Sequence, residues 1–233
     1  MMAKIIGILG GMGPEATAEL FLRIIKATPA ERDQDHLRII IDNNPQIPDR
    51  TAAIMNRGPS PLPELVSTGL NLERAGVDFI VIPCNTAHYY YDLLIKELNV
   101  PVLHMIRITA ERVHRLYPEA DDLGLLATDG TIKSGIYSTE MGKFGLNVLT
   151  PMREDQQRVM DAIYHHIKTG DLREGRRIIL NVGRKLIDRG SDLIICGCTE
   201  VSLVLKDGDL NRPVVDPMQI LVETAVSIAL RSD

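Results

Sequence analysis

Two segments of the chain repeat one order of residue types, and both end in a cysteine. The first begins at Gly76 and reaches Cys84, and the second begins at Gly190 and reaches Cys198. In each, an aspartate comes two residues after the glycine, a run of apolar and mostly β-branched residues follows, and a small polar residue succeeds the cysteine. Short apolar runs bounded by turn residues are typical of strands buried on both faces of a parallel sheet. The chain is therefore constrained to build one local structure twice.

The repetition extends to two further landmarks, which keep the same order along the chain. Ile6–Gly13 aligns with Leu123–Gly130, and Pro101–His104 aligns with Pro213–Asp216. Similarity that recurs in one order indicates duplication of a strand-turn-helix unit. We predict an α/β protein of two similar lobes, each with a parallel-type sheet flanked by helices. A pseudo-twofold axis would relate the lobes and place the active site in the interlobe cleft.

Apolar runs that alternate with segments of helical periodicity give the predicted elements. Strands are predicted at 4–9, 37–42, 77–83, 101–104, 123–127, 146–149, 191–196 and 213–215. Helices are predicted at 14–27, 60–75, 86–98, 106–117, 133–144, 153–168, 171–189, 199–206 and 217–231. The N-terminal lobe, which carries Cys84, is predicted to comprise 1–104 plus 214–233, and the C-terminal lobe, which carries Cys198, to comprise 105–213.

Composition excludes several classes of protein. A chain of 233 residues, 45% of them apolar, can bury a large core, and its net charge of −5 argues against a nucleic-acid-binding face. The three cysteines cannot all pair, which favours a reducing compartment. No apolar run reaches the ~20 residues that cross a bilayer. We expect a cytoplasmic protein with neither nucleic acid nor membrane as a partner.

The predicted strand ends make the two matched cysteines candidates for acid and base chemistry. Ligands of open α/β sheets bind beyond the carboxyl ends of the strands, where the N-terminus of the following helix stabilises a thiolate. Residues that follow the cysteines can cap those helices or hold a carboxylate, namely Asn85, Thr86 and Thr199. One thiol alone would indicate a nucleophile, whereas two opposed thiols indicate proton transfer on opposite faces of one carbon.

Other interpretations of these motifs remain open. A free cysteine is often a plain core residue, which is our interpretation of Cys196. A metal site would require Cys-x-Cys, which is not a usual zinc spacing, together with Cys84 and His88. The turn Gly11–Ala16 fits a GxGxxA dinucleotide fingerprint, but a proline and a glutamate stand where a pyrophosphate needs donors. A tight turn whose amides approach a small anion is the alternative.

Two cations are candidates for binding a carboxylate. Arg50 follows a loop stiffened by prolines, and a guanidinium held there could grip a carboxylate through two hydrogen bonds. The alternative is a surface arginine paired with Asp49. Lys168 closes a predicted helix, where the helix dipole alone favours a cation, so its position by itself indicates a structural role.

Three motifs at the predicted strand ends occur together in this chain, namely Met2–Thr17, Pro83–His88 and Gly197–Glu200. As a set they resemble the aspartate/glutamate racemase family, and most closely its aspartate racemase branch. The likeness covers essentially the whole chain and extends to Asn43–Arg50, Ala127–Thr131 and Asp216–Met218. The first turn lacks the Asp-Ser-Gly opening of glutamate racemases, and Glu200 replaces their histidine. Both departures favour the aspartate branch.

The resemblance implies racemisation without pyridoxal phosphate, metal or nucleotide, in which Cys84 and Cys198 act as base and acid on the substrate Cα. The substrate-binding residues that it implies are Met12 through its backbone, Asn85, Thr86, Thr131, Thr199 and Glu200. Arg50 and Lys168 match positions that hold the side-chain carboxylate in aspartate racemases, which overrides the structural interpretation of Lys168. The resemblance also implies a homodimer.

The expected function is therefore cofactor-independent racemisation of aspartate, a dicarboxylic amino acid, between its L and D forms. Broad-specificity racemases of the family often lack the basic pair, so the presence of Arg50 and Lys168 favours a dicarboxylate. Alternatives with the same architecture are a broad-specificity amino-acid racemase, a maleate isomerase and an arylmalonate decarboxylase. A two-lobed binding protein for an acidic metabolite and a nucleotide-binding oxidoreductase are the alternatives of other classes.

Overall fold

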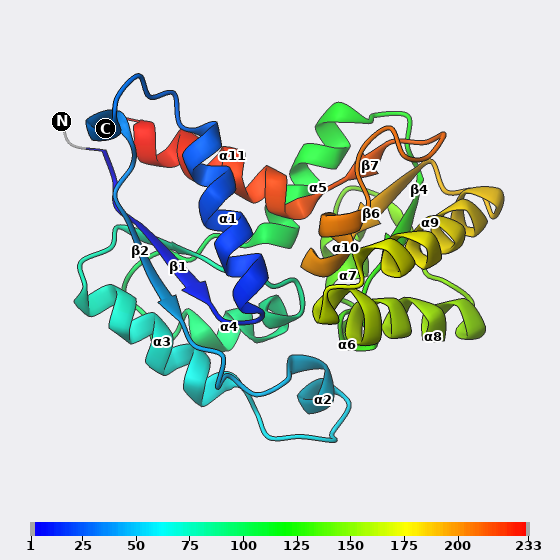
Figure 1. Ribbon diagram of the computed structural model, residues 1–233, viewed down its shortest axis with the longest axis horizontal. Helices are drawn as coiled ribbons and strands as arrows, with labels where there is room; N and C mark the ends of the chain where they lie inside the picture. Colours follow the sequence, from blue (N-terminus) through cyan, green and yellow to red (C-terminus); the bar gives the residue numbers. More distant parts are fainter. Residues whose placement is uncertain (1–2, 232–233) are drawn as a thin grey trace. The chain divides into compact units, whose positions relative to one another are not determined.

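The computed structural model describes residues 3–231, which divide into two compact units (Figure 1). Unit 1 takes the described residues up to Met105 and from Met218 onward, and unit 2 is Ile106–Pro217. The sequence assigned 214–217 to the N-terminal lobe, whereas these residues belong to unit 2 because β7 (Val214–Val215) pairs with a strand of that unit. Residues 1, 2, 232 and 233, which the sequence assigned to the N-terminal lobe, lie outside the described residues.

Unit 1 is built on a parallel sheet in the order β2-β1-β3. Its strands are β1 (Ile6–Gly10), β2 (Ile39–Asn43) and β3 (Phe79–Val81). Its helices are α1 (Pro14–Ala27), α2 (Arg50–Ile54), α3 (Leu62–Arg74), α4 (Tyr91–Leu94) and α11 (Pro217–Leu230). Figure 1 shows α1 and α3 running along either side of this sheet. Because helices cover both faces, every residue of β1 is buried, as the continuous apolar run predicted.

Unit 2 is built on a parallel sheet in the order β5-β4-β6-β7. Besides β7, its strands are β4 (Asp122–Leu126), β5 (Asn147–Leu149) and β6 (Leu193–Cys196). Its helices are α5 (Met105–Leu116), whose first residue belongs to unit 1, α6 (Asp129–Ser134), α7 (Ile136–Gly142), α8 (Arg153–Asp161), α9 (Leu172–Asp188) and α10 (Thr199–Val204). The core of this unit lies where the apolar faces of α8 and α9 pack against β4 and β6.

The two sheets repeat one strand order, which confirms the predicted pair of similar α/β lobes. β1, β2 and β3 correspond to β4, β5 and β6. The segment of unit 1 that aligns with β7 forms only one bridge, between Ile80 and Val102. The prediction of a strand at 101–104 is therefore wrong. The two segments nevertheless make the same hydrogen bond to the neighbouring strand. The Pro101 carbonyl accepts from Ile80 N–H at 2.8 Å, and the Pro213 carbonyl accepts from Ile194 N–H at 2.9 Å.

Several predicted helices are interrupted. The helix predicted at 86–98 is a 3-10 turn, η2 (Thr86–Tyr90), followed by α4. The one predicted at 133–144 is split into α6 and α7 at Gly135, which takes a left-handed φ of 66°. The one predicted at 153–168 continues from α8 into a π turn (Ala162–His166) and the 3-10 turn η4 (Ile167–Thr169). α2 was not predicted.

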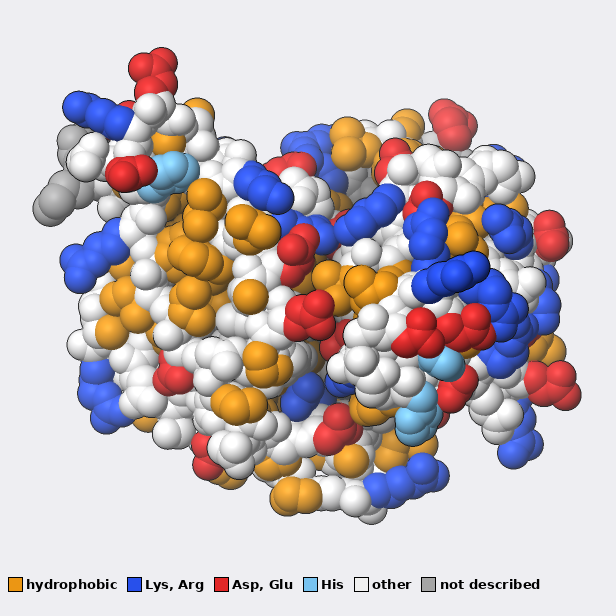
Figure 2. All heavy atoms as spheres, in the orientation of Figure 1, with side chains coloured by type: hydrophobic (Ala, Val, Ile, Leu, Met, Phe, Trp, Pro, Cys, Tyr) orange, Lys and Arg blue, Asp and Glu red, His pale blue; other side chains and the backbone are white. Residues whose placement is uncertain are grey.

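Arg and Lys side chains gather over α9 in Figure 2, interleaved with acidic ones. Arg176 pairs with Asp209, Arg177 with Glu174, and Lys185 with Asp155. These basic residues therefore form a salt-bridged helix face. Among residues 3–231, no helix combines the length and the apolar composition that crossing a membrane requires.

Candidate active site

Cys84 lies just beyond the carboxyl end of β3, where the chain turns into η2. The side chain is 6% exposed. His88, one turn further on, places Nδ1 2.9 Å from the Cys84 carbonyl oxygen. Asn85 and Thr86, the two predicted ligands that follow the cysteine, are buried beside it. Unit 1 thus brings three of the predicted site residues into one tight turn at the end of a strand.

Cys198 takes the N-cap position of α10, beyond the carboxyl end of β6. Its Sγ donates to Oε2 of Glu200 at 2.8 Å, and Thr199 Oγ1 donates to the same oxygen at 3.2 Å. Burial, followed by the negative charge and hydrogen bond of Glu200, raises the pKa of the Cys198 thiol well above its usual value. The sequence suggested helix N-termini as the means of lowering the pKa of one thiol. At Cys198 burial and Glu200 outweigh that effect, so this cysteine rests as a thiol.

Lys168 projects from η4 to the other oxygen of the same carboxylate. Its Nζ lies 3.6 Å from Glu200 Oε1 and 4.5 Å from the centre of the Tyr164 ring. The ammonium acts to lower the pKa of Cys198 and so offsets part of the effect of Glu200. In unit 2 one carboxylate therefore contacts both an ammonium and a thiol.

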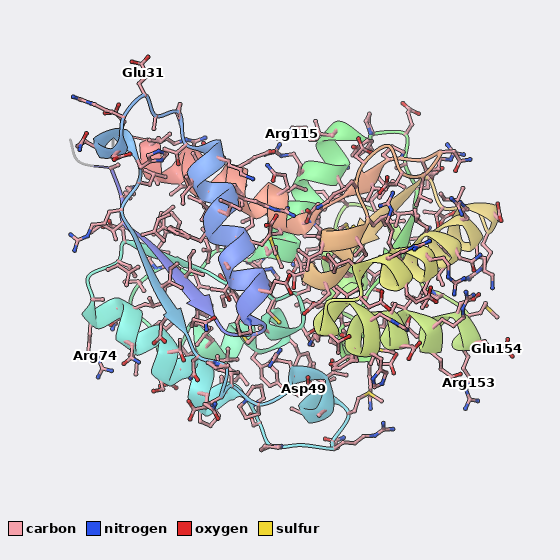
Figure 3. The ribbon with its side chains drawn as sticks, viewed as in Figure 1. Glu31, Asp49, Arg74, Arg115, Arg153 and Glu154 are labelled. Carbon is pink, nitrogen blue, oxygen red and sulfur yellow. The ribbon has the colours of Figure 1, made fainter. Side chains whose placement is uncertain are left out.

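Arg50 is buried at the start of α2, where the proline-stiffened loop folds around its guanidinium. Nη1 donates to the carbonyls of Ile47 and Pro48 at 3.2 and 3.1 Å, and Nη2 donates to that of Met12 at 3.4 Å. Asp49, labelled in Figure 3, uses its carboxylate to cap α2 by accepting from Ala52 N–H at 2.7 Å. The arginine is therefore held by backbone carbonyls of unit 1 and is not a surface residue.

Met12 and Thr131 occupy the first turns after β1 and β4. Met12 is buried in the same cluster as Cys84. Thr131 is buried in α6, and its N–H donates to Oγ1 of the N-cap Thr128 at 3.3 Å. Because β4 and β6 are adjacent and parallel, Thr131 and Cys198 lie at the same edge of the sheet in unit 2.

The dinucleotide and metal alternatives gain no support from these turns. The amide of Gly11, which a phosphate or small anion would need, donates to Thr17 Oγ1 at 2.9 Å. Both ring nitrogens of His88 are engaged in hydrogen bonds, and Cys196 lies fully buried in the core of unit 2. Within residues 3–231, no group of three or more His, Cys, Asp and Glu side chains could hold a metal ion.

Comparison with known proteins places this arrangement in a family. A family model described as Asp/Glu/Hydantoin racemase matches residues 9–225. Because the match covers most of the chain and both cysteine turns, the chain belongs to the Asp/Glu/hydantoin racemase family.

Three relatives are similar over nearly the whole chain. The structure of an aspartate racemase from Picrophilus torridus is 33% identical with a TM-score of 0.86, covering 97% of this chain and 94% of that one. An aspartate racemase homologue from Pyrococcus horikoshii is 26% identical with a TM-score of 0.77, covering 99% and 100%. The broad-specificity amino-acid racemase RacX of Bacillus subtilis is 29% identical, covering 97% of this chain and 98% of that protein.

Sequence reasoning missed two contacts of the cysteines. It noted Glu200 only as a departure from glutamate racemases and a binding residue, although the carboxylate bonds directly to the Cys198 thiol. It considered His88 only as a metal ligand, although the imidazole bonds to the Cys84 carbonyl. The signal for His88 is its spacing of one helical turn from Cys84, which brings i and i+4 residues together.

Proposed function

We propose that this chain racemises aspartate by a two-thiol acid/base mechanism that needs no cofactor. The observation that carries the proposal is the repeated placement of a buried thiol beyond the carboxyl end of equivalent strands, Cys84 after β3 and Cys198 after β6. Family membership supports racemisation as the reaction. One thiol would act on each face of the substrate Cα.

In one direction, Cys84 enters as a thiolate and removes the Cα proton. The carbanion then takes the thiol proton of Cys198 on the opposite face, which leaves Cys84 as the thiol and Cys198 as the thiolate. That product state is ready for the reverse reaction. Lys168 supports this cycle because its charge offsets the repulsion between Glu200 and a Cys198 thiolate.

Arg50 supports a dicarboxylic substrate. Its buried guanidinium donates to three backbone carbonyls, and a buried positive charge favours binding of an anionic group. We propose that Arg50 binds the side-chain carboxylate of aspartate, with Lys168 on the side of unit 2. Asn85, Thr86, Thr131, Thr199 and the Met12 backbone would hold the α-groups, with Glu200 beside them.

A broad-specificity racemase is the second candidate, because the similarity to RacX extends over nearly the whole of both chains. Its substrate range would include neutral and basic amino acids. We also propose a homodimer in the cytoplasm, which sedimentation and cell fractionation would test.

The decisive experiment follows deuterium uptake and enantiomer formation by chiral chromatography, with a panel of L-amino acids in deuterated buffer. We expect racemisation of aspartate well above that of alanine or lysine. Cys84→Ala and Cys198→Ala should each lower it by ~10² to 10⁴-fold, as for loss of a positioned acid or base.

Cys196→Ala is the matched control, because it removes a buried thiol of unit 2 that lies in the core. It should keep most of the activity. Substantial racemisation by either of the other single variants would contradict the two-thiol mechanism, whereas equal rates across the panel would replace aspartate with the broad-specificity alternative.

A further inference from the structure

Unit 1 contains a buried histidine that the proposed reaction does not use. His88 is 2% exposed and lies in η2, one turn after Cys84. Its Nδ1 is 2.9 Å from the Cys84 carbonyl oxygen, and its Nε2 is 3.2 Å from the backbone nitrogen of Met105. The ring thus bridges the cysteine turn and the first residue of α5.

The two partners determine which ring nitrogen carries the proton. The amide of Met105 can only donate, so Nε2 accepts, and the proton must be on Nδ1, which donates to the Cys84 carbonyl. Burial lowers the pKa of His88, which keeps the imidazole neutral. A protonated ring would lose the bond from Met105, so only the neutral Nδ1–H form satisfies both contacts.

This bridge fixes the peptide that follows Cys84. The N–H of His88 itself donates to the Asn85 carbonyl at 3.1 Å, which leaves the imidazole to hold the carbonyl one residue earlier. The His88 ring packs against the His104 ring, with the two centroids 5.1 Å apart. The Tyr91 ring packs against His104 as well, at a centroid distance of 4.5 Å. A hydrogen bond from Tyr91 Oη to the Val102 carbonyl at 3.0 Å fixes that block.

We propose that His88 is a positioning residue for Cys84. By holding the Cys84 carbonyl, it fixes the direction of the Cα–Cβ bond and therefore the place of the thiol. It anchors this turn to Met105, where the chain leaves unit 1. The consequence for catalysis rests on the proposed function, but the effect on the thiol itself does not.

Two substitutions separate the two hydrogen bonds. The amide nitrogen of His88→Asn can take the place of Nδ1 and keep the bond to Cys84. His88→Gln reaches the position of Nε2 and keeps only the contact with Met105. His104→Asn is the matched control, because it alters the same buried aromatic block and leaves in place the side chain that bonds to Cys84 and Met105.

The primary readout is the alkylation rate of each cysteine by iodoacetamide, followed by peptide mass spectrometry of the folded full-length chain. We expect His88→Gln to change the rate at Cys84 by about tenfold, because the turn no longer holds the thiol in its place. The rate at Cys198 should not change, and His88→Asn and His104→Asn should resemble the parent protein. In parallel, kcat/KM for racemisation should fall roughly ten- to a hundredfold in His88→Gln and recover in His88→Asn.

An unchanged Cys84 rate in folded His88→Gln would overturn the proposal, as would equal changes at both cysteines. Because alkylation needs no substrate, this outcome is independent of whether the chain racemises aspartate. If His88→Gln does not fold, nitrogen NMR of the histidine-labelled parent protein measures the tautomer and the titration of the His88 ring instead. The proposal requires the Nδ1–H form with no titration between about pH 5.5 and 8.5, and either the Nε2–H form or a titrating ring contradicts it.

Discussion

The Cys198 thiol and the Lys168 ammonium share one carboxylate, that of Glu200. Burial of the thiol and, after it, the negative charge of this carboxylate oppose ionisation and raise the pKa of Cys198. The ammonium reduces this cost without removing it. Glu200 therefore adds to the effect of burial in keeping Cys198 a thiol.

Glu200→Gln should lower the pKa of Cys198, because the amide keeps the shape of the side chain and removes its charge. We expect alkylation of Cys198 to become about tenfold faster at neutral pH, with Cys84 unchanged. The rate of racemisation should fall by ~10²-fold, since a smaller fraction of Cys198 carries the thiol proton that it must donate. Peptide mass spectrometry and chiral chromatography measure the two effects.

Glu174→Gln is the control for this substitution, because Glu174 pairs with Arg177 on the surface of α9, away from the cysteines. If the alkylation rate of Cys198 were unchanged in Glu200→Gln, burial alone would account for the raised pKa of this thiol.

At the scale of single residues, the sequence indicates candidate site residues but not the partners that the structure gives them. The repeated strand-end cysteines were found from residue types alone. The hydrogen bond between Cys198 and Glu200 depends on the side-chain geometry around a buried N-cap, which no spacing in the sequence specifies. Likewise, the partner of Lys168 depends on a π turn that changes the direction of the helix just before it.

At the scale of elements, α9 and η4 approach closely at a glycine. A Cβ on Gly175 would lie 2.4 Å from Cγ1 of Ile167, the residue before Lys168. The absence of a side chain at Gly175 thus allows η4 to lie against α9 and sets the position of the ammonium.

Gly175→Ala should destabilise the protein, although alanine is normally the better helix former. The gain of ~1 kcal/mol in helix propensity is outweighed by overpacking, which costs about 1–3 kcal/mol when the neighbour cannot move freely. We expect a net loss of ~1 kcal/mol in urea unfolding. Gly142→Ala in α7, where an added Cβ meets nothing within 4 Å, should instead be neutral or stabilising. Equal gains in both variants would show that η4 moves aside without cost.

The element pattern was predicted where periodicity was strong and failed at local breaks. The strands of both sheets were found within a few residues because continuous apolar runs distinguish them. The break at Gly135 had a visible signal in the glycine, whereas the π turn after α8 has none, because its residues also suit an α-helix. The predicted strand 101–104 became a single bridge because only Val102 pairs with β3.

At the scale of the whole molecule, ion pairs on unit 2 make its stability depend on pH. Arg176 binds Asp209 through two hydrogen bonds of 2.6 and 2.7 Å, and this contact lowers the pKa of Asp209 from 3.8 to about 2. A lowered carboxyl pKa stabilises the folded state above the unfolded value of 3.8, and this contribution is lost as the pH falls towards 2.

Asp209→Asn should therefore lower the free energy of unfolding at neutral pH, and the difference from the parent protein should shrink below pH 3.8. Both side chains are partly exposed, so solvent screening keeps the effect modest. Urea unfolding at a series of pH values measures it. Arg176→Gln should show the same convergence, and a difference that stays constant into acid would contradict the role of this pair.

The division into two units also has a consequence for synthesis on the ribosome. Unit 2 is one continuous stretch, Ile106–Pro217, whereas unit 1 is completed only by α11. Leu221, Val222 and Ala225 of that helix are fully buried, and the Ala229 carbonyl accepts from Lys4 N–H at 3.0 Å. The part of unit 1 that precedes unit 2 along the chain therefore lacks α11 until unit 2 has been translated. We therefore expect unit 2 to complete its fold before unit 1, whose apolar surface against α11 stays exposed to chaperones until then, in contrast to the usual order of folding along the chain.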